Sequence, residues 1–194
     1  MGGETGLRVI IGISGASGAI YGLRLLERLR SQENVETHLI LSKSGEKTMF
    51  LETGKLAADA RGLAHFWYPL DDISCRLASG SNSMDAMVVA PCSIHTMSAI
   101  AHGISSNLLV RAADVMLKER RKLILLVRES PLHLGHLRNM TSLAEMGAII
   151  APPIPAFYHH PQTVMDVVDH SVDRVVDLLG LPDPTVRRWN GVTK

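Results

Sequence analysis

Short apolar runs rich in Val, Ile and Leu recur along the chain, each about as long as a β-strand. They are nearly continuous rather than alternating with polar residues, which is typical of strands buried on both faces of a parallel sheet. The pattern predicts strands at 7–13, 35–41, 85–90, 122–127 and 147–152.

Segments with apolar positions at helical spacing separate these runs. They predict helices at 19–30, 107–121, 137–147 and 163–179, the last with a valine-rich face that should lie along the sheet. Alternation of strand and helix predicts one α/β domain over residues 1–194, a doubly wound Rossmann- or flavodoxin-like parallel sheet with helices on both faces. We expect residues 1–6 to be disordered and 180–194 to form a C-terminal tail; 53–78 indicates only helix and surface.

Composition and charge argue against some classes of partner. The 194 residues carry 20 Lys and Arg against 19 Asp and Glu, and no basic stripe with interleaved aromatics appears, which argues against a nucleic-acid partner. The two cysteines match no paired-spacing motif, and no charged-then-apolar leader precedes the first strand. The apolar stretches are too short to span a bilayer. These features predict a cytoplasmic protein with no membrane partner.

The stretch GISGASG at 12–18 follows the first predicted strand. Ligands of such folds bind beyond the carboxyl ends of the strands, where helix N-termini offer free N–H groups to anions. The glycine spacing is not the dinucleotide fingerprint G-x-G-x-x-G, and no Walker lysine follows. On this stretch alone, an anion-binding loop and a helix capped by Ser14 and Ser17 are equally good interpretations.

The other predicted strands also end in polar residues. Ser42, the PCSIHT stretch at 91–96, Arg128-Glu129 and the PIPAFYHH stretch each follow a strand, so five strand ends meet at one edge. Hydroxyls, loop N–H groups and a forked guanidinium suit a flat ligand with many acceptors and a phosphate. A nucleotide or a flavin fits best.

Seven ordered blocks carry a family resemblance: GISGASGAIYG, HLILSK, SGS, PCSIHT, NLLVRAADVMLKERRKLILLVRESPLHLGHLRNM, PPIPAFYHHPQT and RRWNG. From about Val9 to Gly191 the chain resembles the UbiX-type flavin prenyltransferases, including the B subunits named with aromatic-acid decarboxylases. PCSIHT is also similar to the flavin-binding motif of the wider flavin-containing cysteine decarboxylases, which share the fold.

This resemblance implies a single flavoprotein domain that alkylates its flavin. Members bind reduced FMN and dimethylallyl monophosphate, join the prenyl group to flavin N5 and close a ring at C6, without a metal. The product, prenylated FMN, serves a UbiD-type decarboxylase. Members form homo-oligomers, typically dodecamers, so site residues are expected to cross subunit boundaries.

The resemblance also implies site residues. For FMN they are Gly15, Ala16, Ser17, Ser42, Ser93, Ile94, His95, Thr96 and Arg128. For the allylic phosphate they are Tyr158, Arg174, Lys118, Arg111 and Glu129. Cleaving an allylic C–O bond leaves a dianionic phosphate, so cations and hydroxyl donors must surround it. We expect proton transfer by Glu129 with help from Ser17 and Glu52, and an aromatic face from Trp189 over the electron-poor allyl group.

Each assignment has a structural alternative. Lys118 would be a solvated helix lysine, and Arg128-Glu129 a surface ion pair of little energetic consequence. Tyr158 would pack on the core, and Trp189 would anchor the tail.

The histidines and Cys92 invite other chemistry. The pairs His133/His136 and His159/His160 lack a third ligand at a recognisable spacing, which argues against a zinc site. Cys92 follows a buried strand with no assignable base, so packing is the better interpretation. SGSNS at 79–83 is either a flexible linker or, as the family resemblance favours, a mobile loop that covers the flavin.

Two other function classes stay open. An FMN-dependent cysteine decarboxylase would share the fold and PCSIHT, but it would need an early histidine base, and SGASG with RESPLHLGHL speaks against it. A non-catalytic flavin delivery protein would leave the second cationic cluster unexplained. An independent aromatic-acid decarboxylase is the weakest reading, because no separate acid-binding pocket can be argued.

Overall fold

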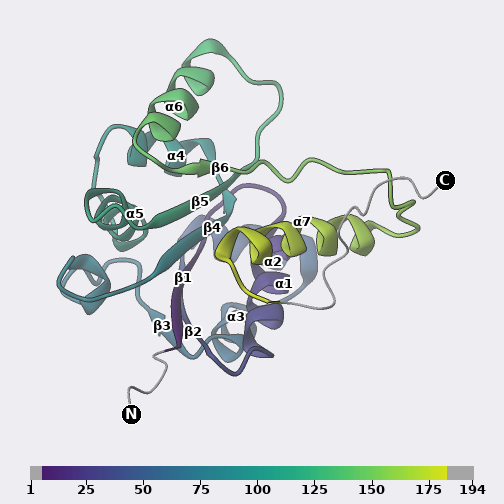
Figure 1. The fold of residues 1–194 in the computed structure, drawn as a ribbon, viewed down its shortest axis with the longest axis horizontal. Coiled ribbons are helices and arrows are strands. Elements are labelled where there is room, and N and C mark those ends of the chain that lie inside the picture. The colour runs from purple at the N-terminus through teal and green to yellow at the C-terminus, as the bar shows by residue number, and fades with distance from the viewer. Residues whose placement is uncertain (1–5, 183–194) are drawn as a thin grey trace.

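A computed structural model describes residues 6–182, and in it a parallel sheet takes the order β3-β2-β1-β4-β5-β6 (Figure 1). The strands β2 and β3 are added in turn on one side of β1, and β4, β5 and β6 are added in turn on the other side. The strand order therefore reverses between β1 and β4, which is where ligands bind in doubly wound folds. The strands are β1 Leu7–Ile13, β2 Val35–Leu41, β3 Phe66–Tyr68, β4 Ala86–Cys92, β5 Lys122–Val127 and β6 Ile149–Ile150.

Helices cover both faces of this sheet, which confirms the predicted fold class. The helix α1 and the long α7 pack on one face, and α4 and α5 pack on the other, with α6 beside α4 (Figure 1). The helical elements are α1 Ala19–Arg30, α2 Lys43–Thr53, α3 Ala57–Leu63, a 3-10 turn η1 Arg76–Ala78, α4 Ile94–Ala101, α5 Leu108–Lys118, α6 Leu134–Glu145 and α7 Val164–Leu179.

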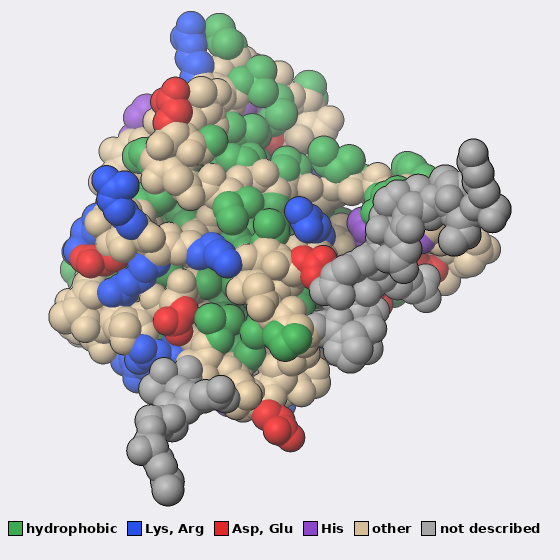
Figure 2. Space-filling model, in the orientation of Figure 1, with side chains coloured by type: hydrophobic (Ala, Val, Ile, Leu, Met, Phe, Trp, Pro, Cys, Tyr) green, Lys and Arg blue, Asp and Glu red, His purple; other side chains and the backbone are tan. Residues whose placement is uncertain are grey.

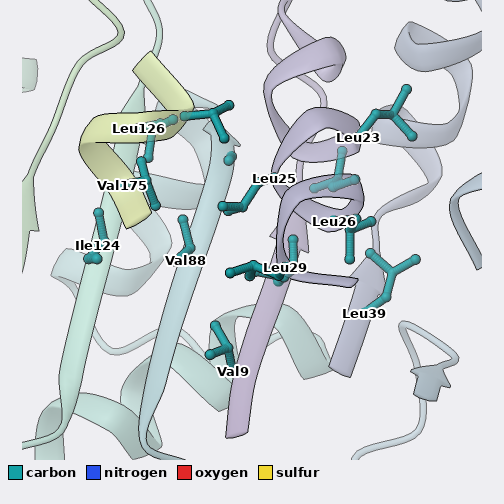
Figure 3. Close-up of a cluster of buried hydrophobic side chains, with 14 of the residues drawn as sticks. Val9, Leu23, Leu25, Leu26, Leu29, Leu39, Val88, Ile124, Leu126 and Val175 are labelled. Atoms are coloured by element: carbon teal, nitrogen blue, oxygen red, sulfur yellow. The ribbon is translucent and has the colours of Figure 1, made fainter. Parts of the chain in front are cut away.

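The core under α1 and α7 explains why these two helices hold their positions. Leu25 of α1 and Val175 of α7 point toward β4 and β5, where Val88, Ile124 and Leu126 lie (Figure 3). All five side chains are 2% exposed or less. Burial of each such side chain contributes about 1.5–3 kcal/mol relative to its exposure, so α7 is anchored at its middle and C-terminal turns.

The structure differs from the predicted elements at several boundaries. The edge strand β3 has only three residues, with Phe66 and Trp67 exposed, so it is too short to stand out as a strand in the sequence. The last strand is two residues long rather than six. The helix predicted to reach 121 ends at Lys118. The helix predicted from 137 begins at Leu134, because the His133 side chain caps it.

Two expectations concern the chain ends. Residues 1–5 and 183–194, which include Trp189, lie outside the described residues, so the expectations of a disordered start and a C-terminal tail concern mostly these residues. Gly180 ends α7 in the left-handed conformation, with φ of 81°. Within residues 6–182, no helix combines the length and apolar character that crossing a bilayer requires.

Candidate active site

Ser14 joins the ends of β1 and β4 at the point where strand order reverses. This buried side chain donates to the carbonyl of Pro91 at 2.8 Å and accepts from the N–H of Ser93 at 2.7 Å. The residue before α1 is Gly18, with φ of 101° and no side-chain cap. The alternative that Ser14 and Ser17 cap the first helix is therefore wrong. Ser14 instead connects the carboxyl ends of β1 and β4 by hydrogen bonds.

The loop Gly15–Ser17 follows β1 at this edge of the sheet. Gly15 packs so closely on α2 that a Cβ there would lie 2.5 Å from Ser44 Oγ, and its carbonyl accepts from Thr48 Oγ1 at 3.2 Å. No acceptor among the described residues serves the backbone N–H groups of Gly15, Ala16 and Ser17. Successive free N–H groups in a turn form a concavity that suits a phosphate.

Glu52, from the last turn of α2, occupies the start of α1. Its carboxylate accepts from the N–H groups of Gly18 at 2.9 Å and Ala19 at 3.0 Å, as expected for an anion at a helix N-terminus. The expectation that the first N–H groups of α1 are free for a ligand is therefore wrong, because a carboxylate from a distant helix takes them. Glu52 does lie beside Ser17, its predicted partner.

Two further helices begin at the same edge, each with a serine cap. Ser42 accepts from the N–H of Gly45 at 2.9 Å at the start of α2. Ser93 accepts from the N–H of Thr96 at 3.2 Å and donates to its Oγ1 at 3.1 Å at the start of α4. The predicted residues Ser93, Ile94, His95 and Thr96 thus form the first turn of α4, with His95 exposed.

Arg128 and Glu129 follow β5 at this edge, both exposed. The backbone N–H of Arg128 donates to the carbonyl of Cys92 at 3.0 Å, while the Glu129 carboxylate accepts from the N–H of Ser130 at 2.9 Å. Ion pairs between described residues do not include one of Arg128 with Glu129, so the alternative of a surface ion pair is wrong. The guanidinium is available to an anionic ligand.

Tyr21 is a residue that sequence reasoning missed. Burial raises the pKa of its phenol, and this is opposed by the positive charge of Arg128 and by a hydrogen bond with Ser171 of α7. Tyr21 therefore links the strand-end residues to α7. The signal available in the sequence was an aromatic residue in the first turn of the helix after the glycine loop.

Tyr158 and Arg174 form a second group on the α7 side. The Tyr158 side chain is 51% exposed, so the alternative that it packs on the core is wrong. Its Oη lies 3.5 Å from His170 Nε2. The Arg174 side chain is 67% exposed and lies 4.0 Å from Asp177. A hydroxyl and a guanidinium thus face solvent on the α7 side of the molecule.

Lys118 and Arg111 lie at the opposite end of the sheet. Lys118 ends α5 just before β5 begins and pairs with Glu119, and Arg111 Nε donates to the carbonyl of Ala78 at 3.1 Å. Figure 2 shows Lys and Arg side chains gathered at the left of the view, over α5 and the crossover to β4. Within one chain, these two cations therefore do not lie beside Tyr158 and Arg174, the other residues predicted to bind the allylic phosphate.

The SGSNS segment lies at the same amino end. A Cβ on Gly80 would meet Lys118 Nζ at 2.7 Å, and Arg121 donates to the carbonyls of Gly80 and Asn82 at 2.8 and 2.6 Å. The expectation that 79–83 covers the flavin is wrong within one chain. Residues that directly precede a parallel strand must lie at its amino end, whereas the glycine loop follows one.

Cys92 and the His133/His136 pair occupy structural positions. Cys92 is fully buried, and burial raises the pKa of its thiol to about 12, which confirms a packing role. His133 accepts from the N–H of Gly135 at 3.0 Å, and its ring stacks on His136 with centroids 3.5 Å apart. Between residues 6 and 182, His, Cys, Asp and Glu form no group of three that could hold a metal ion.

Fold and site together define a class: a doubly wound α/β protein with a phosphate-type loop at the switch point of its sheet. The family model for flavoproteins matches residues 2–178. The flavin prenyltransferase UbiX of Escherichia coli K12 is 52% identical over 186 residues, covering 95% of this chain and 98% of the relative. A probable UbiX-like flavin prenyltransferase of Bacillus subtilis is 46% identical, covering 97% and 92%. The chain therefore belongs to the UbiX-type flavin prenyltransferases of the flavoprotein family.

Solved structures support the same family assignment. AnUbiX (PadA1) in complex with FMN and dimethylallyl pyrophosphate has a TM-score of 0.94 at 43% identity, covering 97% of this chain and 100% of that one. A dodecameric FMN-dependent UbiX-like decarboxylase from Escherichia coli O157:H7 has a TM-score of 0.93 at 48% identity, covering 95% and 100%. The cysteine decarboxylase TvaF, at 22% identity and a TM-score of 0.61, shares the fold alone.

Proposed function

We propose that the protein transfers the dimethylallyl group of dimethylallyl monophosphate to N5 and then C6 of reduced FMN. The observation that carries this proposal is the pairing of two anion-binding groups at one sheet edge. The Gly15–Ser17 loop with Arg128 forms one, and Tyr158 with Arg174 forms the other. Tyr21 is near enough to both groups that the charge of Arg128 and the Ser171 side chain of α7 each lower the pKa of its phenol. Two phosphorylated substrates can thus meet in one crevice.

The first group orients the flavin. The N–H groups of Gly15, Ala16 and Ser17 suit a phosphate, and the first turn of α4, with Ser93 and Ser42 alongside, lines the crevice for a flat ring. Arg128 adds a forked donor. Reduced FMN supplies the electron-rich N5 and C6 atoms. The match with a relative solved with FMN and dimethylallyl pyrophosphate supports this assignment.

The second group stabilises the leaving phosphate. When the allylic C–O bond breaks, its electron pair leaves on the phosphate while the bond to N5 forms. Arg174 and Tyr158 offer cationic and hydroxyl donors to that developing charge. Ring closure needs a proton added to the prenyl double bond before C6 bonds to it, and C6 then releases its own proton; we propose Glu129 as the group that carries these protons, assisted by Ser17 and Glu52. Trp189 is proposed to place its ring over the allyl group.

Lys118 and Arg111 enter this site from a neighbouring subunit. They lie at the amino end of their own sheet, so a second copy must present them to the Tyr158–Arg174 group. We therefore propose a homo-oligomer, as in the dodecameric relative. A site built from two chains would make assembly a condition of activity.

The cellular role follows from the product. Prenylated FMN is proposed to pass to a UbiD-type decarboxylase, and the reaction to take place in the cytoplasm.

The test is anaerobic incubation of the purified protein with reduced FMN and dimethylallyl monophosphate, followed by mass spectrometry of the released flavin. A mass increase of one dimethylallyl unit is expected; a parallel incubation with the pyrophosphate tests the choice of donor. Unchanged FMN that nonetheless co-purifies would overturn the proposal in favour of a flavin delivery protein. Turnover of a cysteine substrate would favour an FMN-dependent cysteine decarboxylase.

A further inference from the structure

Three aromatic rings meet where the segment before α7 folds onto that helix. The His159 and His170 rings have centroids 3.9 Å apart, and the Tyr158 ring meets that of His159 edge-on at 4.3 Å. The Tyr158 and His170 rings are nearly perpendicular, at 89°. Of these three residues, the site proposed above uses only Tyr158, and the two histidines have no assigned role.

His170 holds the position from which a side chain can orient the Tyr158 hydroxyl. Its Nε2 lies 3.5 Å from Tyr158 Oη, a long contact of the kind that often tightens once a substrate binds. His170 precedes Arg174 by one helical turn, so both side chains project from the same face of α7. His170 and Arg174 also line one cavity of about 80 Å³ with Ser171.

The charge around His170 favours a neutral imidazole. Burial lowers its pKa, and His159 and Arg174 lower it further, while Asp173 opposes them. From α1, Arg28 pairs with Asp173 at 3.0 Å, which neutralises that carboxylate. A neutral imidazole carries one N–H donor. An Nε2–H donor points at the Tyr158 oxygen, and the phenol proton then points away from His170.

We propose that His170 is a positioning residue for Tyr158: its Nε2–H donates to the phenol oxygen and so directs the phenol proton toward the phosphate of the allylic substrate. This inference rests on the proposed function, because it takes Tyr158 as a phosphate donor. It names a residue outside the predicted site.

The first test compares His170→Leu with His170→Gln. The leucine variant has no donor, whereas the glutamine amide offers an N–H at a similar reach. We expect His170→Leu to raise the KM for dimethylallyl monophosphate about tenfold, with the affinity for FMN unchanged. His170→Gln should restore most of this loss. Equal defects in both variants would overturn the proposal, since a packing role does not require a donor.

The second test is a double-mutant cycle with Tyr158→Phe. If His170 acts through the phenol, adding His170→Leu to Tyr158→Phe should change the KM no further. Additive effects would overturn the proposal. The matched control is His160→Asn, which removes an exposed imidazole from the same segment; asparagine tolerates the φ of 53° at this position. Its KM should equal that of the unmodified protein.

The same variants distinguish a failure of the His170 positioning role from a failure of the proposed function. A Tyr158→Phe variant with normal kinetics would remove Tyr158 from the phosphate site, and with it the proposed role of His170. A defective Tyr158→Phe variant beside a normal His170→Leu variant would leave the phosphate site intact and overturn only the positioning role.

Discussion

The carboxyl and amino ends of the sheet present ligand-binding groups in different ways. At the carboxyl end, loops of small residues expose backbone N–H groups, and Ser14 ties the two central strands together. At the amino end, long cationic side chains are held by their own chain, as Arg111 is by Asp114 at 2.7 Å. Backbone groups can only serve a ligand that comes to them, whereas long side chains can reach another molecule. We call the carboxyl end of the sheet the receiving edge, because it binds the ligand in its own chain. We call the amino end the contributing edge, because its cationic side chains can reach the site of a neighbouring subunit.

Removing Lys118 is expected to have the largest effect. Lys118→Ala should lower the prenylation rate about 100-fold or more, while FMN affinity and Tm stay unchanged because the side chain is exposed. Lys55→Ala, which removes another exposed lysine, is the control. Mixing Lys118→Ala with Arg174→Ala subunits should restore part of the activity, because some sites then combine two intact edges. No recovery would contradict a contribution across subunits.

Ser17 tests the receiving edge. Ser17→Ala should keep the fold, because the side chain is exposed, and lower turnover about 10–100-fold by removing a hydroxyl beside the reacting ring. Rates of flavin prenylation under single-turnover conditions would measure this. Ser81→Ala, at the amino end, is the comparison, with a small effect expected. Full prenylation by Ser17→Ala would remove Ser17 from the mechanism.

Close packing beneath the receiving edge is tested at Gly22. A Cβ there would lie 2.3 Å from the carbonyl oxygen of Ala90, so Gly22→Ala should reduce the free energy of unfolding by about 1–3 kcal/mol. Gly62→Ala is the matched control, since nothing lies within 4 Å of a Cβ at that helical position; it should stabilise by about 0.5–1 kcal/mol. Urea denaturation measures both. Equal effects would contradict the close approach.

The smallest expected effect concerns pH, at His38 of β2, next to the edge strand β3. Burial lowers the pKa of His38, with Glu36 opposing. Between the folded pKa and the usual value of about 6.5, the unfolded chain binds more protons. Stability should therefore be full above about pH 6.5 and fall as pH drops below it. Thermal unfolding at several pH values should show a shallower decline for His38→Gln than for the unmodified protein; identical slopes would contradict this.

Local patterns predicted much of this site. The five apolar runs, the glycine loop and the polar residues at the strand ends are short-range features, and all of the strand-end residues do share one edge. The placement of 79–83 and Lys118 was also open to a sequence argument, because both lie just before a strand.

The chain's own residues thus determined the fold class and the edge where ligands bind, because hydrophobic periodicity and strand-end chemistry act over a few residues. Only the tertiary structure decided that Glu52 takes the first N–H groups of α1, that Tyr21 reaches Arg128 and Ser171, and that His170 meets Tyr158. Each of these depends on how helices that are separate in the sequence pack against one another. That packing arises from the whole core, and no local pattern encodes it.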